Sequence, residues 1–221
     1  MNSFRFVLKI VLALLFSLGI LFLPAGKIDW IEAWAFIGLL IAYSLIVGYW
    51  LFKNNPALAE KRASSGLPKK NWDAILLLIM GVCMLAQLVV AGLEEKNAPS
   101  QMPLFLKIIG FVLCSITFIV NFLVMKENSF LSRIVEIQKN QKVVDTGPYA
   151  IVRHPMYAGF LPLFIGTGLL LGSQTAIILG IICCIALIAR TALEDKALQK
   201  KLAGYKEYTK KVRYRLFPGI W

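Results

Sequence analysis

The polar side chains best suited to chemistry gather in one stretch, residues 138–157, which reads QKNQKVVDTGPYAIVRHPMY. This stretch contains the only histidine of the chain, His154, between Arg153 and Pro155. Position alone supports two interpretations of His154: a functional imidazole, or a structural histidine that caps a helix or meets lipid headgroups. Pro155 is expected in the first turn of a helix, because its missing N–H would have no partner there. The stretch therefore predicts a polar loop that leads directly into a helix.

A second cluster of charged residues follows an apolar run and reads RTALED, residues 190–195. Arg190 and Glu194 are four residues apart, so they lie on one face of a helix. One interpretation is an ion pair at a membrane interface, with an arginine that extends toward water. The other is a pair of site residues.

Beyond this cluster, apolar residues recur at helical spacing and lysines occupy most of the remaining positions. The apolar positions are Leu198, Leu202, Tyr205, Tyr208 and Val212. This pattern predicts an amphipathic C-terminal helix whose basic side suits a segment lying on anionic lipid. The same helix could instead fold back as a lid over a site, and the spacing does not choose between the two.

The composition indicates which elements position these residues. Of the 221 residues, 58% are hydrophobic and 16% are charged, whereas a soluble globular protein has about 45–50% and about 25%. This balance excludes a soluble enzyme, a disulfide-rich secreted scaffold and a disordered chain. Six stretches can cross a bilayer as helices, or nearly so: 4–24, 31–52, 73–93, 103–123, 156–172 and 175–191. We therefore predict an all-α, polytopic membrane helix bundle with about six transmembrane helices, the last two joined by a tight turn.

The distribution of basic residues predicts the orientation in the membrane. With the N-terminus inside, 21 of the 24 Lys and Arg residues fall on the inner side, and only Lys27, Lys96 and Lys107 fall outside. Because Lys and Arg concentrate on cytoplasmic loops, both termini and both polar clusters are expected to be cytoplasmic. In a prokaryote the protein would lie in the inner membrane. The same bias accounts for the formal net charge of +12 without nucleic-acid binding.

Other kinds of site find little support in the sequence. The four cysteines lie inside apolar runs without metal-ligand spacing, so we expect packing residues, with neither disulfides nor a metal site. They are Cys83, Cys114, Cys183 and Cys184. No internal repeat is visible and no acidic residue or histidine stands in the middle of a span, which disfavours a transporter.

The motifs of the last two fifths of the chain also match a known family. In order they are GPYxxxRHPMYxG (147–159), a short helical hairpin, RxxxEDxxL (190–198), YxxY (205–208) and RLFP (215–218). They resemble the isoprenylcysteine carboxyl methyltransferase family, which includes prokaryotic relatives and, more distantly, phospholipid methyltransferases. The resemblance spans residues 129–219. It implies an N-terminal transmembrane region with four spans, 1–128, and a methyltransferase core, 129–221.

The resemblance implies an S-adenosylmethionine-dependent methyltransferase whose cofactor site is built from the last two spans and their cytoplasmic flanks. The residues that it assigns to the cofactor are Gln138, Gln141, Lys142, Val143, Val144, Tyr149, His154, Pro155, Met156, Tyr157 and Glu194. It assigns Arg190 a catalytic role beside the carboxylate of the acceptor. The family often has consecutive glutamates where this chain has Glu194 and Asp195, and often a histidine where it has Gln141.

Methyl transfer to a carboxylate needs no strong base, because a carboxyl group with a pKa of about 4 is ionised at neutral pH. The enzyme must align the reactants and place a cation beside the carboxylate, which suits the planar donors of Arg190. The resemblance therefore implies carboxyl O-methylation of a lipidic or amphipathic acceptor such as an isoprenylcysteine. Three alternatives stay open: a phospholipid ethanolamine N-methyltransferase, which would need a base, an NADPH-dependent reductase of the sterol-reductase type, and a non-catalytic membrane protein.

Overall fold

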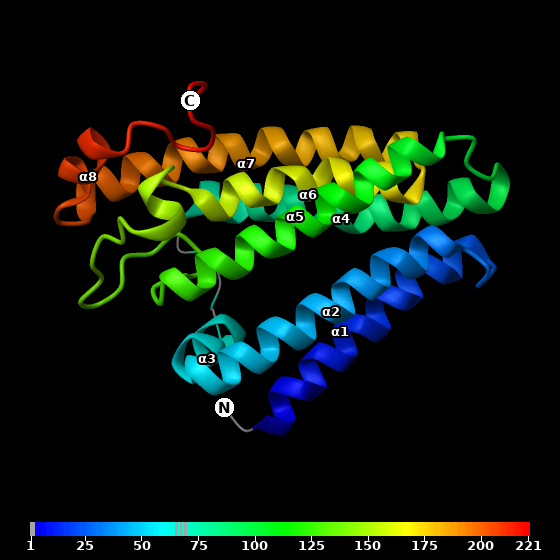
Figure 1. The fold of residues 1–221 in the computed structure, drawn as a ribbon, viewed down its shortest axis with the longest axis horizontal. Coiled ribbons are helices and arrows are strands. Elements are labelled where there is room, and N and C mark those ends of the chain that lie inside the picture. The colour runs from blue at the N-terminus through cyan, green and yellow to red at the C-terminus, as the bar shows by residue number, and fades with distance from the viewer. Residues whose placement is uncertain (1–2, 65, 67, 69) are drawn as a thin grey trace.

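The computed structural model describes the backbone of residues 3–64, 66, 68 and 70–221, and the side chains of these residues except 3–6 and 61–64. Of the basic residues in the charge count, Lys69 lies outside the described residues, and the side chains of Arg5, Lys61 and Arg62 lie outside the described part as well. Within the described part every regular element is a helix. The long helices share one long axis, and the N-terminus, α3 and α8 lie toward the same end of it (Figure 1).

In chain order the helices are α1 (Ser3–Ala25), α2 (Ile31–Asn54), α3 (Pro56–Ser64), α4 (Asn71–Asn97), α5 (Leu104–Glu127), the 3-10 turn η1 (Gly147–Ala150), α6 (Pro155–Leu171), α7 (Gln174–Lys201) and α8 (Tyr205–Lys211). Helices α1, α2, α4, α5 and α7 are long and apolar enough to cross a membrane, and α6 is a shorter apolar helix. The polytopic, all-helical membrane fold expected from the sequence is confirmed, and the chain is an integral membrane protein.

The six predicted spans coincide with α1, α2, α4, α5, α6 and α7, with one large difference in length. The last predicted span ends at residue 191, whereas α7 continues to Lys201. Hydropathy falls after residue 191, but the backbone stays helical because the polar residues beyond it are good helix formers. Arg190 and Glu194 consequently lie on one uninterrupted helix.

Helix α6 has only 17 residues and is enclosed by its neighbours, with ten of its residues buried. It packs closely against α5 and α7. A Cβ atom at Gly110 of α5 would lie 2.3 Å from the backbone nitrogen of Leu170, and one at Gly180 of α7 would lie 2.2 Å from the carbonyl oxygen of Phe164. The small residues therefore let the helix backbones touch, as the sequence predicts for this hairpin.

One buried polar side chain links three helices within the apolar bundle. Gln87 of α4 is 2% exposed, and its Nε2 donates to the carbonyl oxygens of Phe164 and Ala176 over 2.8 and 2.7 Å. Its amide therefore satisfies two carbonyl groups where no water is available. This bridge fixes the relative height of α4, α6 and α7, and all three contribute to the site described below.

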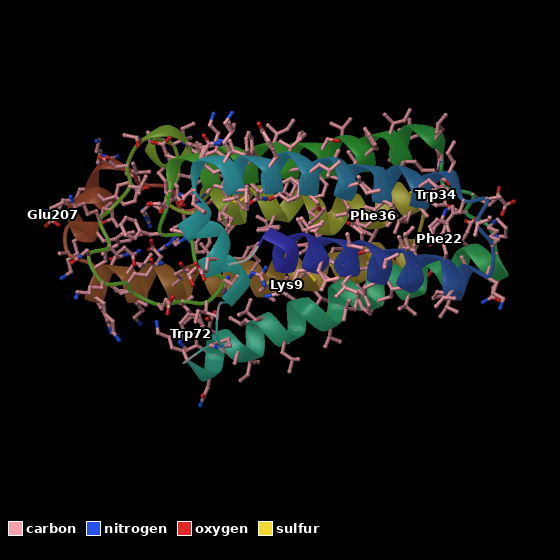
Figure 2. All side chains as sticks on the ribbon, turned by 90° about the horizontal axis from the view of Figure 1, so that it is seen from below. Lys9, Phe22, Trp34, Phe36, Trp72 and Glu207 are labelled. Atoms are coloured by element: carbon pink, nitrogen blue, oxygen red, sulfur yellow. The ribbon has the colours of Figure 1, made fainter. Side chains whose placement is uncertain are left out.

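The hairpin of α1 and α2 is fastened to the bundle at the end opposite α3. Phe22 and Trp34 lie side by side there (Figure 2), with ring centroids 4.9 Å apart. Lys107 of α5 pairs with Glu32 of α2 over 2.6 Å. These contacts hold the hairpin at one end.

The amphipathic C-terminal segment is not one helix. Helix α7 ends at Lys201, Gly204 adopts φ +79, and α8 begins at Tyr205. The residues predicted to form the apolar face, from Leu198 to Val212, pack together as a cluster with Val143 instead of facing outward. The alternative of a helix lying on lipid is therefore wrong for this face, because the segment turns back onto the polar loop before α6.

Candidate active site

The segment between α5 and α6 folds over the end of the bundle where α8 lies. Asn128 at the end of α5 donates from Nδ2 to Tyr149 Oη over 2.8 Å. Gln138 donates from Nε2 to the carbonyl oxygen of Phe130 over 2.5 Å, and its backbone N–H donates to Gln141 Oε1 over 2.9 Å. These bonds close the segment into a folded loop beside α6 and α7.

A cavity lies between this loop, the first turn of α6, the last turns of α7, and α8. Its walls combine apolar and phenolic side chains with two carboxylates, Glu136 and Glu194. Residues that line it without having been assigned from the sequence are Asn128, Phe130, Leu131, Ser132, Ile134, Glu136, Arg153, Leu198, Leu202, Tyr205 and Tyr208. The cavity is thus acidic at two points and otherwise largely apolar.

The structure brings ten of the eleven predicted cofactor residues to this cavity. They are Gln141, Lys142, Val143, Val144, Tyr149, His154, Pro155, Met156, Tyr157 and Glu194. Gln138 does not line it, but holds Phe130 and Gln141, which do. Arg190 lies behind the wall. Their roles toward a cofactor or acceptor stay predictions.

Asp195 is a hub behind the cavity, and its carboxylate is fully buried. It accepts hydrogen bonds from the side chains of Arg153 (2.8 and 3.1 Å), Gln199 (2.8 Å), Tyr205 (3.0 Å) and Arg215 (3.0 Å), while His154 Nε2 lies 3.3 Å away. Two guanidinium groups thus share one carboxylate. The hub joins the loop before α6, α7, α8 and the C-terminal segment.

The backbone around His154 is paired with the C-terminal segment. The N–H groups of Arg153 and His154 donate to the carbonyl oxygens of Tyr214 and Arg215, both over 2.9 Å. Arg153 Nη1 also donates to the carbonyl oxygen of Val212 over 2.9 Å. Burial opposes the charge of Arg153, but its bonds to Asp195 outweigh this and raise its pKa, so the guanidinium stays charged.

The buried phenols of the site stay protonated. Burial raises the pKa of Tyr149, Tyr205 and Tyr208, and the charge of Asp195 raises that of Tyr205 further. Tyr208 Oη accordingly donates to the carbonyl oxygen of Tyr149 over 2.7 Å. These tyrosines act as neutral donors that attach α8 to the loop.

A second chain of polar contacts runs from α4 to the cavity. Arg190 Nε donates to Asp73 Oδ1 over 2.8 Å, and its Nη1 donates to Tyr157 Oη over 2.6 Å. Tyr157 Oη in turn donates to Glu194 Oε2 over 2.5 Å. Arg190 is 4% exposed and its Nη2 donates to the carbonyl oxygen of Arg133 over 3.0 Å. The direct Arg190–Glu194 ion pair considered from the sequence is thus replaced by a bond through Tyr157.

Asp73 is a site residue that sequence reasoning missed. It is 1% exposed, and its Oδ2 accepts the backbone N–H of Val135 over 2.8 Å. It therefore holds both Arg190 and the loop that lines the cavity. The available signal was a carboxylate in the first turn of an apolar span, where a buried charge demands a partner.

The segment that carries this arrangement matches the model of the phospholipid methyltransferase family over residues 105–204. This part of the chain belongs to that family. The phospholipid methyltransferase family takes in the isoprenylcysteine carboxyl methyltransferases, so the resemblance seen in the motifs is confirmed. The protein is a membrane methyltransferase. No curated protein matches the chain.

The phospholipid methyltransferase match begins within α5 and ends at Gly204, before α8. Several side chains that complete the site lie outside it: Asp73 on one side, and Tyr205, Tyr208 and Arg215 on the other. The matched region supplies the cavity wall, and the flanking segments supply the charges and phenols that hold it.

Proposed function

We propose that this membrane methyltransferase uses S-adenosylmethionine bound in the cavity and methylates a lipidic acceptor. The observation that carries the proposal is the single cavity at which ten predicted cofactor residues meet, with the carboxylate of Glu194 fixed in its wall.

The chemistry of the cavity walls fits this cofactor. S-adenosylmethionine combines a sulfonium cation, an amino acid and an adenosine. Glu194 offers a carboxylate for the cationic part. The rings of His154 and Tyr157, stacked 5.7 Å apart, offer aromatic faces for the adenosine. The first turn of α6 opens on the cavity, and a helix N-terminus favours an anionic group such as the amino-acid carboxylate.

NADPH fits the same walls less well. Its phosphates need cations, but the guanidinium of Arg153 is already neutralised by Asp195. Lys142 is the remaining strong cation in the wall, and Glu136 and Glu194 oppose an anionic ligand. The reductase alternative therefore gains no support from the charges of the site.

The residues of the chain act by holding and shielding the reactants. When bound, the cofactor supplies a methyl group on a cationic sulfur. Glu194 is held at its angle by Tyr157, which is held by Arg190, so the carboxylate need not reorganise. The α8 cluster and the loop cover the cavity, and the exclusion of water strengthens these charges.

The acceptor best supported by this geometry is an amine, as in an ethanolamine headgroup. All three guanidinium nitrogens of Arg190 are engaged, by Asp73, Tyr157 and the carbonyl oxygen of Arg133, which leaves none for an acceptor carboxylate. Two carboxylates in the wall, Glu136 and Glu194, suit an ammonium, and either can accept the proton that the amine must lose. The isoprenylcysteine carboxylate is the second candidate, because the phospholipid methyltransferase family includes that activity.

We infer that the cavity faces the cytoplasm. It lies at the end of the bundle that carries α3, α8 and the N-terminus (Figure 1), together with most of the Lys and Arg residues. The positive-inside rule places such an end in the cytoplasm, where S-adenosylmethionine is made.

Titration calorimetry of the purified full chain tests the cofactor. We expect saturable binding of S-adenosylmethionine and none of NADPH. Glu194→Gln should weaken S-adenosylmethionine binding by about 10- to 100-fold, the effect of losing a hydrogen bond to a charged group worth roughly 1.5–3 kcal/mol. The control is Glu207→Gln, the same change at an exposed position on α8 (Figure 2), which should bind as the wild type does. Equal affinities for both variants, or binding of NADPH instead, would contradict the proposal.

Transfer of a tritiated methyl group tests the acceptor. We expect label in phosphatidylethanolamine supplied in mixed micelles, in a product that keeps its label in alkali, because an N-methyl bond is stable to base. Label that appears only with a prenylated cysteine and is released by alkali as methanol would instead establish a carboxyl ester.

A further inference from the structure

A second hollow of about 460 Å³ lies beside the cavity, along α1 and α2. Its walls are mainly apolar, with Ala13 and Leu14 on α1, Val47 and Leu51 on α2, and Met125 on α5. We call it the hairpin groove. On α1 the lining positions follow a spacing of three and four residues, so one helical face borders the groove along its length. Such a face between membrane helices suits a hydrocarbon chain.

Two cations line this groove, Lys9 and Arg133. Lys9 lies near the start of α1, on the side of α3 (Figure 2). The guanidinium of Arg133 is exposed, and within the described part of the chain no hydrogen bond or ion pair of this guanidinium is found. The hairpin groove is therefore apolar along its length and basic where the loop crosses it.

The loop residue Arg133 connects the hairpin groove to the cavity. Its carbonyl oxygen accepts from Arg190 Nη2 over 3.0 Å, in the polar chain that ends at Glu194. Its neighbours Ser132 and Ile134 line the cavity, whereas its own side chain lines the groove. Only this strand of the loop separates the two hollows.

We propose that the hairpin groove is the binding site for the phospholipid acceptor, with one acyl chain along α1 and α2 and the phosphate at Arg133. A guanidinium presents a planar pair of donors that matches a phosphate in bidentate fashion. From there the headgroup reaches over the loop strand toward Glu194. This inference rests on the proposed function and adds the place and the residues of lipid recognition.

Lipid binding to the purified full chain in uncharged detergent tests the inference, with phosphatidylethanolamine as the probe and native mass spectrometry as the readout. Arg133→Gln should weaken binding at least about tenfold, since a charge-assisted contact is lost. Its control is Arg213→Gln. Arg213 is likewise exposed, with its carbonyl oxygen bound by an arginine, and it does not line the groove.

The apolar part is tested by filling the hairpin groove. Ala13→Trp should lower phosphatidylethanolamine binding by a similar factor, whereas Leu12→Trp, on an exposed position of α1 outside the groove, should not. Neither Arg133→Gln nor Ala13→Trp should change the affinity for S-adenosylmethionine, which also verifies folding. Unchanged lipid binding in both variants would overturn the inference.

Further arms separate the alternatives. Diacylglycerol that binds as tightly as phosphatidylethanolamine would overturn the role of the phosphate. A change from dimer to monomer in Ala13→Trp would make a second copy of the chain the occupant and would overturn the lipid. Lipid binding that depends on Arg133 in a protein that never binds S-adenosylmethionine would refute the proposed function and leave the groove standing.

Discussion

Replacing Asp195 by asparagine is expected to lower the free energy of unfolding by about 3–5 kcal/mol, the usual effect of breaking a buried ion pair. Its Oδ1 accepts from Arg153 and Tyr205, and its Oδ2 accepts from Arg153, Gln199 and Arg215. An amide nitrogen at either place would face at least one guanidinium donor. The lost charge would also leave two arginines without their shared counter-ion.

The measurement is the apparent melting temperature in detergent, which should fall on the order of 10 °C. Glu194→Gln is the matched comparison, because it removes the adjacent charge of α7 but leaves the hub intact. It should melt close to the wild type while losing cofactor affinity. An Asp195→Asn variant that melts within about 2 °C of the wild type would show that the hub does not hold the C-terminal segment.

Asp73→Asn is expected to have the largest effect on the site from a residue that does not line the cavity. Without Asp73, the nearest carboxylate available to Arg190 is Glu194, one helical turn away on α7. Arg190 would then pull Glu194 out of the cavity wall. We expect affinity for S-adenosylmethionine to fall about tenfold and methyl transfer to fall at least about 100-fold, since positioning errors act on the rate as well as on binding.

The controls separate positioning from general damage. Asp29→Asn makes the same change at an exposed carboxylate just before α2 and should alter neither quantity. Combining Asp73→Asn with Arg190→Met removes both charges, so the double variant should recover part of the melting temperature that Asp73→Asn loses. It should not recover methyl transfer. Wild-type cofactor affinity and methyl transfer in Asp73→Asn would contradict the positioning role.

The sequence by itself determined the class of protein and the position of its helices. Hydropathy is a local property, so the six apolar stretches coincide with the six helices of the structure. The start of α6 at Pro155 and the turn at Gly172, where φ is +73, also follow from the preferences of single residues. The residues before and after Pro155 line one cavity because the motif that contains them is short and continuous.

The tertiary structure alone decided which charge each site residue meets. Asp73 and Arg190 are 117 residues apart, and no local pattern relates two helices across such a separation. Glu194 and Asp195 are neighbours in sequence but project about 100° apart around a helix. One therefore lines the cavity and the other holds the hub, a division that depends on where α6 and α8 pack.

The direction of the C-terminal segment was decided in the same way. Its apolar spacing fits a membrane surface and a protein surface equally, because both offer hydrocarbon to bury. Only the break at Gly204 and the cluster around Tyr205 and Tyr208 show that this face packs on the loop. Local composition thus determined the elements of this methyltransferase, while the contacts between distant elements, on which buried charges depend, were decided by the fold.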